Sequence, residues 1–245
     1  GSMTANTSGA TNTSVGYQSM CANTTGENNV SMGVYALRKN ISGGSNTAIG
    51  CASLQENTTA SNNTAVGHQS LQANTTGTNN SAVGTSSLKL NTTGTCNTGI
   101  GRNALFSNTT AGNNTALGYD ALFANLTGAN NTAVGSLSLD ANTTGDKNIA
   151  VGRSALTDNT AGICNTAVGY YALGANTTAS YNTAFGSTAL DANTTGANNT
   201  AVGEASLTAN TTGHSNVAVG KSALAANITY TCNTAVGFES LTSNT

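Results

Sequence analysis

The side chains that could do acid–base or nucleophilic chemistry are few and widely separated along the chain. The only two histidines are His68 and His214, and no cysteine or serine near them completes a recognisable constellation. A nucleophile, its base and an orienting group must lie within hydrogen-bond reach of one another. The aspartates are equally scattered, at Asp120, Asp140, Asp158 and Asp191, whereas a glycosidase pair needs two carboxyl groups within about 5 to 10 Å. We therefore expect no catalytic residues and no enzyme activity.

The five cysteines do not form a metal-binding pattern. No C-x-x-C pair occurs, and Cys96, Cys164 and Cys232 follow one another at intervals of 68 residues, unlike the close pairs of zinc sites. The glycine-containing turns carry Asn and Thr instead of the regular aspartates of calcium-binding β-rolls. We expect free thiols, no metal and no cofactor.

The composition excludes several further classes of protein. Only 16 of the 245 residues are charged, the net charge is -2, and 43 Thr and 36 Asn make up about a third of the chain, where an ordinary globular enzyme has about a quarter charged residues. Disorder is disfavoured because 37% of the residues are hydrophobic. With no basic patch and no apolar run of about 18 residues, we expect neither nucleic-acid binding nor membrane insertion.

A 17-residue repeat runs through the sequence without insertion or deletion. The unit is N-T-A-V-G-x-x-A-L-x-x-N-T-T-G-x-x, numbered here as positions 1 to 17 of a coil, and its position-5 glycine recurs fourteen times from Gly16 to Gly237. Asn also occupies position 12 in every unit, from Asn23 to Asn244. Seventeen residues are too few for a helical repeat, and short Thr/Val/Leu segments between Asn/Gly turns are typical of strands. The sequence predicts an all-β protein, a parallel β-solenoid (β-roll) of about fourteen coils with two short strands in each.

Fourteen copies of one unit show which residue types each position accepts. Position 4 accepts only Val, Ile, Leu, Met or Phe, and position 9 is Leu in every unit except at Met20. We expect these two columns to form the apolar interior, with the position-2 threonines pointing inward beside position 4.

Positions 3 and 8 accept only small residues: Ala, Ser or Gly at position 3 and Ala or Ser at position 8. Each lies next to a large apolar residue, so in a strand its side chain points to the opposite face. A water-exposed face would also accept Lys or Glu, which predicts that a second chain packs against these columns. The expected oligomer seam contains, at position 3, Ala48, Ala65, Ala116, Ala133 and Ala167, and at position 8, Ala104, Ala121 and Ala155.

Residues 1–3 look like a remnant of cloning, and residues 4–245 form a single repeat array. No capping sequence is recognisable at either end, so we expect the array to be a fragment of a longer fibre.

The unit Asn-Thr-Ala-Val-Gly-x-x-Ala-Leu, as at residues 131–139 and 165–173, resembles repeats of long phage tail-fibre-like proteins. It is also similar to the shorter Ala-Ile-Gly-x-x-Ala unit of trimeric autotransporter adhesin heads. The resemblance covers residues 6–245 and implies a homotrimeric fibre, extracellular on a bacterial surface or a virion. It also implies a role in adhesion or host recognition, with a cell-surface receptor or glycan bound by other parts of the parent protein.

Two further hypotheses concern the surface. Tyr17, Tyr119, Tyr170 and Tyr171, at the variable positions 6 and 7, are weak candidates for stacking on a sugar. As an alternative function, regular Asn and Thr columns at positions 12 and 14 could project on one side and bind ice.

Overall fold

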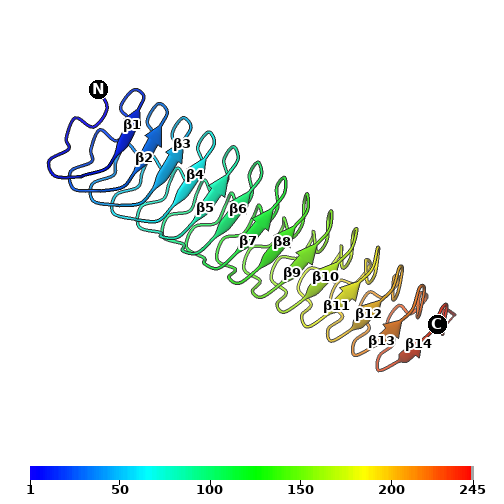
Figure 1. The fold of residues 1–245 in the computed structure, drawn as a ribbon. Coiled ribbons are helices and arrows are strands. Elements are labelled where there is room, and N and C mark those ends of the chain that lie inside the picture. Colours follow the sequence, from blue (N-terminus) through cyan, green and yellow to red (C-terminus); the bar gives the residue numbers. More distant parts are fainter. Residues whose placement is uncertain (244–245) are drawn as a thin grey trace. The chain divides into compact units, whose positions relative to one another are not determined.

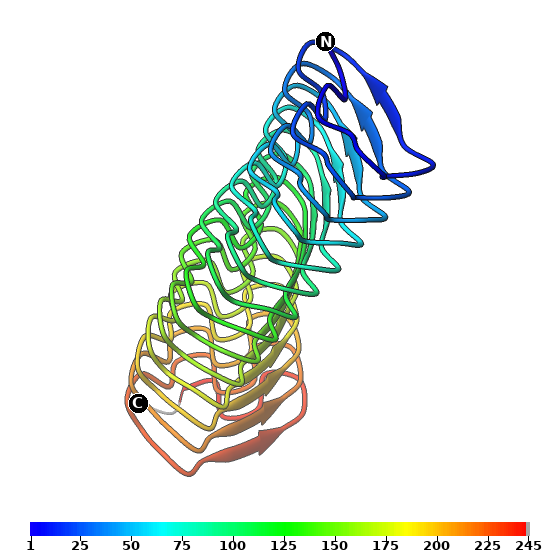
Figure 2. The ribbon, with the colours of Figure 1, turned by 90° about the vertical axis from the view of Figure 1, so that its left-hand side faces the viewer.

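The computed structural model describes residues 1–243, so Asn244 and Thr245 lie outside the described part. The chain comprises two compact units, Gly1–Thr127 and Gly128–Thr245. In each unit the chain winds into successive coils, and the figures show them stacked one behind the next (Figures 1 and 2).

Every coil contributes one three-residue strand, formed by positions 2 to 4. The first unit contains β1 (Thr13–Val15), β2 (Val30–Met32), β3 (Thr47–Ile49), β4 (Thr64–Val66), β5 (Ser81–Val83), β6 (Thr98–Ile100) and β7 (Thr115–Leu117). The second contains β8 (Thr132–Val134), β9 (Ile149–Val151), β10 (Thr166–Val168), β11 (Thr183–Phe185), β12 (Thr200–Val202), β13 (Val217–Val219) and β14 (Thr234–Val236). The prediction of a parallel β-solenoid is confirmed. The expectation of two strands per coil is wrong, because positions 6 to 11 form consecutive turns.

Neighbouring strands within each unit pair in parallel, each residue beside its equivalent one repeat along. In the first unit, for example, Thr47, Ala48 and Ile49 of β3 pair with Thr64, Ala65 and Val66 of β4. Columns of the sequence repeat are therefore columns in space.

Four positions of each coil carry positive φ angles, and these angles bend the chain into a closed turn. The position-5 glycines have φ between +128° and +145°, a region that is essentially restricted to glycine. Positions 7, 9 and 17 adopt the left-handed conformation, with φ between 47° and 55° for the position-9 leucines. A left-handed leucine costs about 1 to 2 kcal/mol, which full burial of its side chain, at about 1.5 to 3 kcal/mol, offsets.

The interior of each coil is made of small and uncharged side chains around one leucine. Positions 3, 8 and 9 are fully buried in nearly every coil, and so are the asparagines of positions 1 and 12. The serines of position 8, with the exception of Ser240, keep their hydroxyl bonded inside the coil. Ser53 Oγ, for example, donates to the Gly50 carbonyl across 3.0 Å.

The buried asparagines satisfy backbone groups that the bends leave without a ladder partner. The carbonyl of Ala60, at position 15, accepts one bond from Asn46 Nδ2 at 2.8 Å and another from Asn57 Nδ2 at 3.0 Å. The Asn46 backbone N–H donates to Asn29 Oδ1 of the preceding coil across 2.9 Å. Because a buried polar group without a partner costs about 1 to 3 kcal/mol, these two columns tolerate no other residue.

The structure corrects the expected orientation of the strand. Position 3 points into the coil and positions 2 and 4 point out, so the aliphatic residues of position 4 do not share the interior with the leucines. A coil this narrow has room for one leucine, two small side chains and two asparagines, and the larger residues of the strand lie on its outer side.

The same correction applies to the alanines that the sequence placed at a seam between chains. All of them are fully buried within a single chain: Ala48, Ala65, Ala116, Ala133, Ala167, Ala104, Ala121 and Ala155. Their columns accept only small residues because the coil's own interior has no space for larger ones. They present no surface to another molecule.

Candidate interaction surface

In each unit, the outer side of the strands carries a column of aliphatic side chains, called here the aliphatic ridge. It consists of the position-4 residues: Val15, Met32, Ile49, Val66, Val83, Ile100 and Leu117 in the first unit, and Val134, Val151, Val168, Phe185, Val202, Val219 and Val236 in the second. In the first unit, all of them except Val66 are between 38% and 56% exposed. An exposed apolar surface of this kind is a candidate interaction site.

Position 2, on the same outer side of the strand, is occupied mainly by threonine. In the described residues the hydroxyl groups of these threonines, such as Thr47, Thr64 and Thr98, make no hydrogen bond to another protein group, and the side chains are partly exposed. Val30, Ser81, Ile149 and Val217 replace Thr in this column. Neither column of the strand's outer side carries a charge in any coil.

Charged and aromatic side chains follow the ridge at position 6, beyond the position-5 glycine. Arg102, Arg153, Glu204 and Lys221 lie in this column, and the Arg102 guanidinium stacks 5.6 Å from the centre of the Tyr119 ring. The strand's outer side thus has an apolar centre and a mixed polar border, which is the usual anatomy of a protein interface.

The tyrosines proposed for sugar stacking do not gather into one site. Tyr17, Tyr119 and Tyr170 are exposed and come from different coils, while Tyr171, at position 7, is only partly exposed. The rings of Tyr170 and Tyr171 lie 6.2 Å apart and are tilted by 40°. No hollow in the described residues collects them into a binding pocket.

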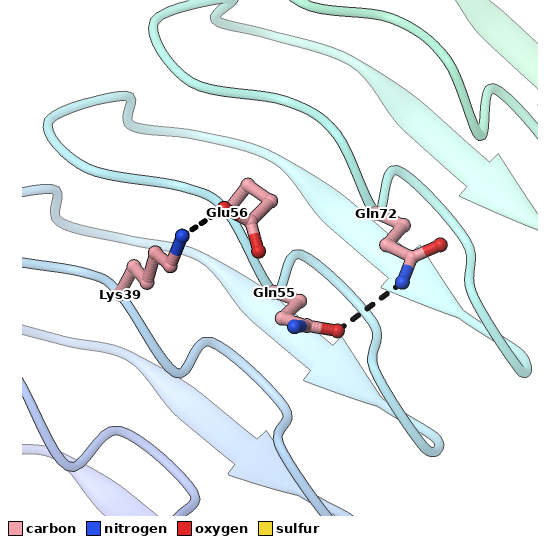
Figure 3. Close-up of polar contacts among 4 residues, drawn as sticks. All are labelled: Lys39, Gln55, Glu56 and Gln72. Atoms are coloured by element: carbon pink, nitrogen blue, oxygen red, sulfur yellow. Dashed lines mark hydrogen bonds and ion pairs between the residues drawn. The ribbon is translucent and has the colours of Figure 1, made fainter.

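Positions 10 and 11 form contacts between like or complementary residues of successive coils. Figure 3 shows the Gln72 Nε2 donating to Gln55 Oε1 across 3.2 Å, and the ion pair of Lys39 with Glu56. Further along the first unit, the rings of Phe106 and Phe123 stack with centres 5.2 Å apart and an angle of 17° between planes. These contacts join coil to coil and leave no open site.

The carboxyl group of Asp140, at position 10, has a shifted pKa. Partial burial raises the pKa of Asp140 above its ordinary value, and the nearby Asp158 charge acts in the same direction. A hydrogen bond from Thr157 Oγ1, across 2.6 Å, opposes the shift by stabilising the ionised form. The largest cause of the raised pKa is the burial of the Asp140 carboxyl group.

The histidine and cysteine side chains, which could act in acid–base, nucleophilic or metal chemistry, form no such site in the described residues. His68 and His214 are exposed, and His214 lies 3.3 Å from the hydroxyl of Ser215. All five cysteines are free. Over residues 1–243, no group of three or more His, Cys, Asp or Glu side chains comes together in a way that could hold a metal ion. The same described part contains no helix long and apolar enough to span a bilayer.

The two columns proposed for ice binding lie in different environments. The position-12 asparagines are buried in the described coils, which corrects the expectation that they project beside position 14. The position-14 residues are exposed, and their threonine hydroxyls have no protein partner in the described residues, as at Thr76, Thr93 and Thr110. The adjacent position-13 threonines instead bond the backbone of the next coil; Thr75 Oγ1, for example, donates to the Thr92 carbonyl across 3.1 Å.

Comparison with protein-family models matched no family, and comparison with curated proteins found no matching protein.

The sequence does not predict the ridge, because large apolar residues such as those of position 4 are ordinarily expected in the interior. The sequence does contain a signal for it. Position 4 ranges from Val to Phe185, and a close-packed interior rarely accommodates such a change in volume at equivalent sites. The truly buried columns are those whose side-chain volume hardly varies.

Proposed function

We propose that this chain is a non-catalytic segment of a multi-chain fibre, most simply a homotrimer, that carries an adhesion or host-recognition domain away from its base. The observation that carries the proposal is that each unit stacks closely similar coils, without a pocket in the described residues, and bears an uncharged aliphatic ridge on its outer side. The resemblance of the repeat to phage tail-fibre-like and trimeric adhesin proteins supports the same function.

The mechanical part of this function rests on the bonds between coils. Within each unit, strand pairing, asparagine ladders and the contacts of positions 10 and 11 all run from one coil to the next. Parallel ladders whose buried asparagines are bonded from coil to coil resist local opening, which suits a fibre that holds a distant tip in place. In this proposal the fibre is extracellular, on a bacterial surface or a virion, and a receptor or glycan is bound elsewhere in the parent protein.

Size-exclusion chromatography with light scattering under reducing conditions tests the proposal. The expected mass is three times the 24.1 kDa of one chain. A mass of 24.1 kDa at all concentrations would refute the multi-chain fibre.

A second candidate function is ice binding, which the exposed threonines of position 14 favour. Their column is uncharged and loses its threonine only at Ser8, Ser42 and Ala161. The threonine columns at positions 2 and 13 accept apolar residues and are nevertheless not buried, so apolar replacements in these columns are compatible with an exposed position. Thermal hysteresis of the wild-type protein, reduced when Thr93 and Thr110 are both changed to Lys, is the expected result for this candidate. Wild-type protein without hysteresis at high concentration would exclude it.

A further inference from the structure

We propose that the aliphatic ridge of one chain packs against the ridge of a second copy of the same chain, and that this contact is the seam of the fibre. This inference rests on the proposed function and adds the surface through which the chains associate. It replaces the small-residue columns, which are enclosed within each chain.

The size of the ridge fits a stable contact between chains. At the exposed fractions of its side chains, position 4 leaves on the order of 500 Å² uncovered in residues 1–127, near the top of the range of about 300 to 600 Å² for the largest patch of a monomer. In residues 128–243, Phe185 and Val236 of the ridge are 56% and 70% exposed. Each unit therefore offers its own apolar surface toward the roughly 800 Å² per partner that a standard interface buries.

The regular spacing of the ridge residues favours a second copy of the same chain as the molecule that packs against the ridge. A second chain has the same 17-residue coil and the same strand spacing, so each ridge residue meets a ridge residue at every coil of a unit. A globular partner has no such period and would cover only a few coils. The register between strands places each ridge residue beside the ridge residue of the neighbouring coil, as with Val66, Val83 and Ile100.

The charge distribution allows the same surface to face itself. Neither position 2 nor position 4 holds a charged residue, so two identical faces bring no like charges together in the centre of the contact. The charges of position 6 remain at the border, where they stay hydrated. This arrangement matches the depletion of charge in interface cores.

Substitutions in two adjacent coils test the seam in the full chain. Val83 and Ile100, 38% and 39% exposed, lie on the ridge in neighbouring strands β5 and β6. We expect the double variant Val83→Lys with Ile100→Lys to fold, as judged by circular dichroism, but to reduce the mass to that of one chain. The matched control places lysines in the same two coils at position 14, with Thr93→Lys and Thr110→Lys, and should keep the wild-type mass.

A second, more conservative double variant tests the seam if the lysine variant fails to fold. Val83→Thr with Ile100→Thr retains strand-forming side chains and removes apolar surface, and should weaken association by at least tenfold in a dilution series. An oligomer that resists both ridge variants would overturn the seam and leave the fibre proposal intact. A wild-type chain that is monomeric throughout would instead refute the fibre and the seam together.

Discussion

Asn40 Nδ2 donates a hydrogen bond to Asn23 Oδ1 across 2.7 Å, between the same positions of adjacent coils. Its second hydrogen goes to the Gly43 carbonyl of its own coil at 2.8 Å. Asn57 repeats the relationship one coil later, donating to Asn40 Oδ1 across 2.8 Å. Each buried side-chain amide thus closes its own turn and links it to the preceding one, in a fixed direction along the unit.

Breaking this asparagine ladder should lower the free energy of unfolding. Asn74→Ala removes the donor to Asn57 Oδ1 and the acceptor of Asn91 Nδ2, at 3.0 and 2.9 Å. Asn74 Nδ2 also donates to the Gly77 carbonyl across 2.9 Å. Three buried polar groups then lose a partner, and at about 1 to 3 kcal/mol each we expect the free energy of unfolding to fall by about 3 to 9 kcal/mol. Urea denaturation followed by circular dichroism measures the change. Thr76→Ala, two residues away and exposed, should change it by less than about 0.5 kcal/mol; equal effects of the two variants would contradict the role of the ladder.

The glycines of position 5 and those of position 15 should differ in how well they tolerate replacement by alanine. Gly67, at position 5, has φ of +135°, and a Cβ there would lie 2.5 Å from the Gly84 carbonyl oxygen. Gly67→Ala should therefore cost at least about 1 to 3 kcal/mol from backbone strain alone. Gly77, at position 15, does not have a positive φ. A Cβ on its present backbone would also lie too close to the Gly94 carbonyl oxygen, but alanine already occurs at this position at Ala60, Ala111 and Ala179, so Gly77→Ala should have a much smaller effect on the thermal midpoint. A harmless Gly67→Ala would show that the position-5 bend is not required.

Enlarging an interior alanine distinguishes a buried column from an intermolecular seam. Ala104 is fully buried, and Ala104→Leu should lower the free energy of unfolding by about 1 to 3 kcal/mol through overpacking. The loss should be independent of protein concentration, because the strain lies within one coil. Thr85→Leu, at an exposed position, serves as the control and should leave the urea midpoint nearly unchanged. If Ala104→Leu dissociated an oligomer without destabilising the folded chain, the burial of position 8 would be wrong.

The raised pKa of Asp140 predicts a pH-dependent loss of stability. Because burial makes the folded state bind the proton more tightly than the unfolded chain does, stability falls as pH rises from the unfolded value, near 3.8, through the higher folded pKa. Asp140→Asn should therefore be more stable than wild type near pH 7, and this advantage should disappear near pH 3. Urea midpoints at both values of pH provide the measurement.

Thr157→Val supplies the complementary variant. Removing the hydroxyl that donates to Asp140 takes away a stabiliser of the ionised form. The variant should be less stable than wild type at neutral pH, with a smaller difference in acid. An Asp140→Asn advantage that persisted unchanged at low pH would assign the effect to packing instead of ionisation.

The class of fold could be predicted from the sequence because every coil repeats the same local requirements. The invariant position-5 glycine and the recurring Asn at positions 1 and 12 mark the same bends fourteen times. A bend repeated at a constant spacing stacks like residues on like, and this is sufficient to predict parallel pairing with a shift of one repeat.

The direction in which each column points depended on the tertiary structure. Alternation along a strand shows that Ala48 and Ile49 face opposite sides, but it does not decide which side is inside. The left-handed residues at positions 7 and 9 turn the chain so that position 3 and position 8 both face the enclosed space.

By itself, then, the sequence determined the period, the pairing and the solenoid class, because these follow from local bends and repetition. Only the tertiary structure decided that Ala104 is interior and that Val83 lies on an exposed ridge. The physical reason is the volume of the coil: once one leucine and the asparagines that bond its backbone are enclosed, only small side chains fit beside them. The larger aliphatic residues remain outside, on the surface where we place the contact between chains.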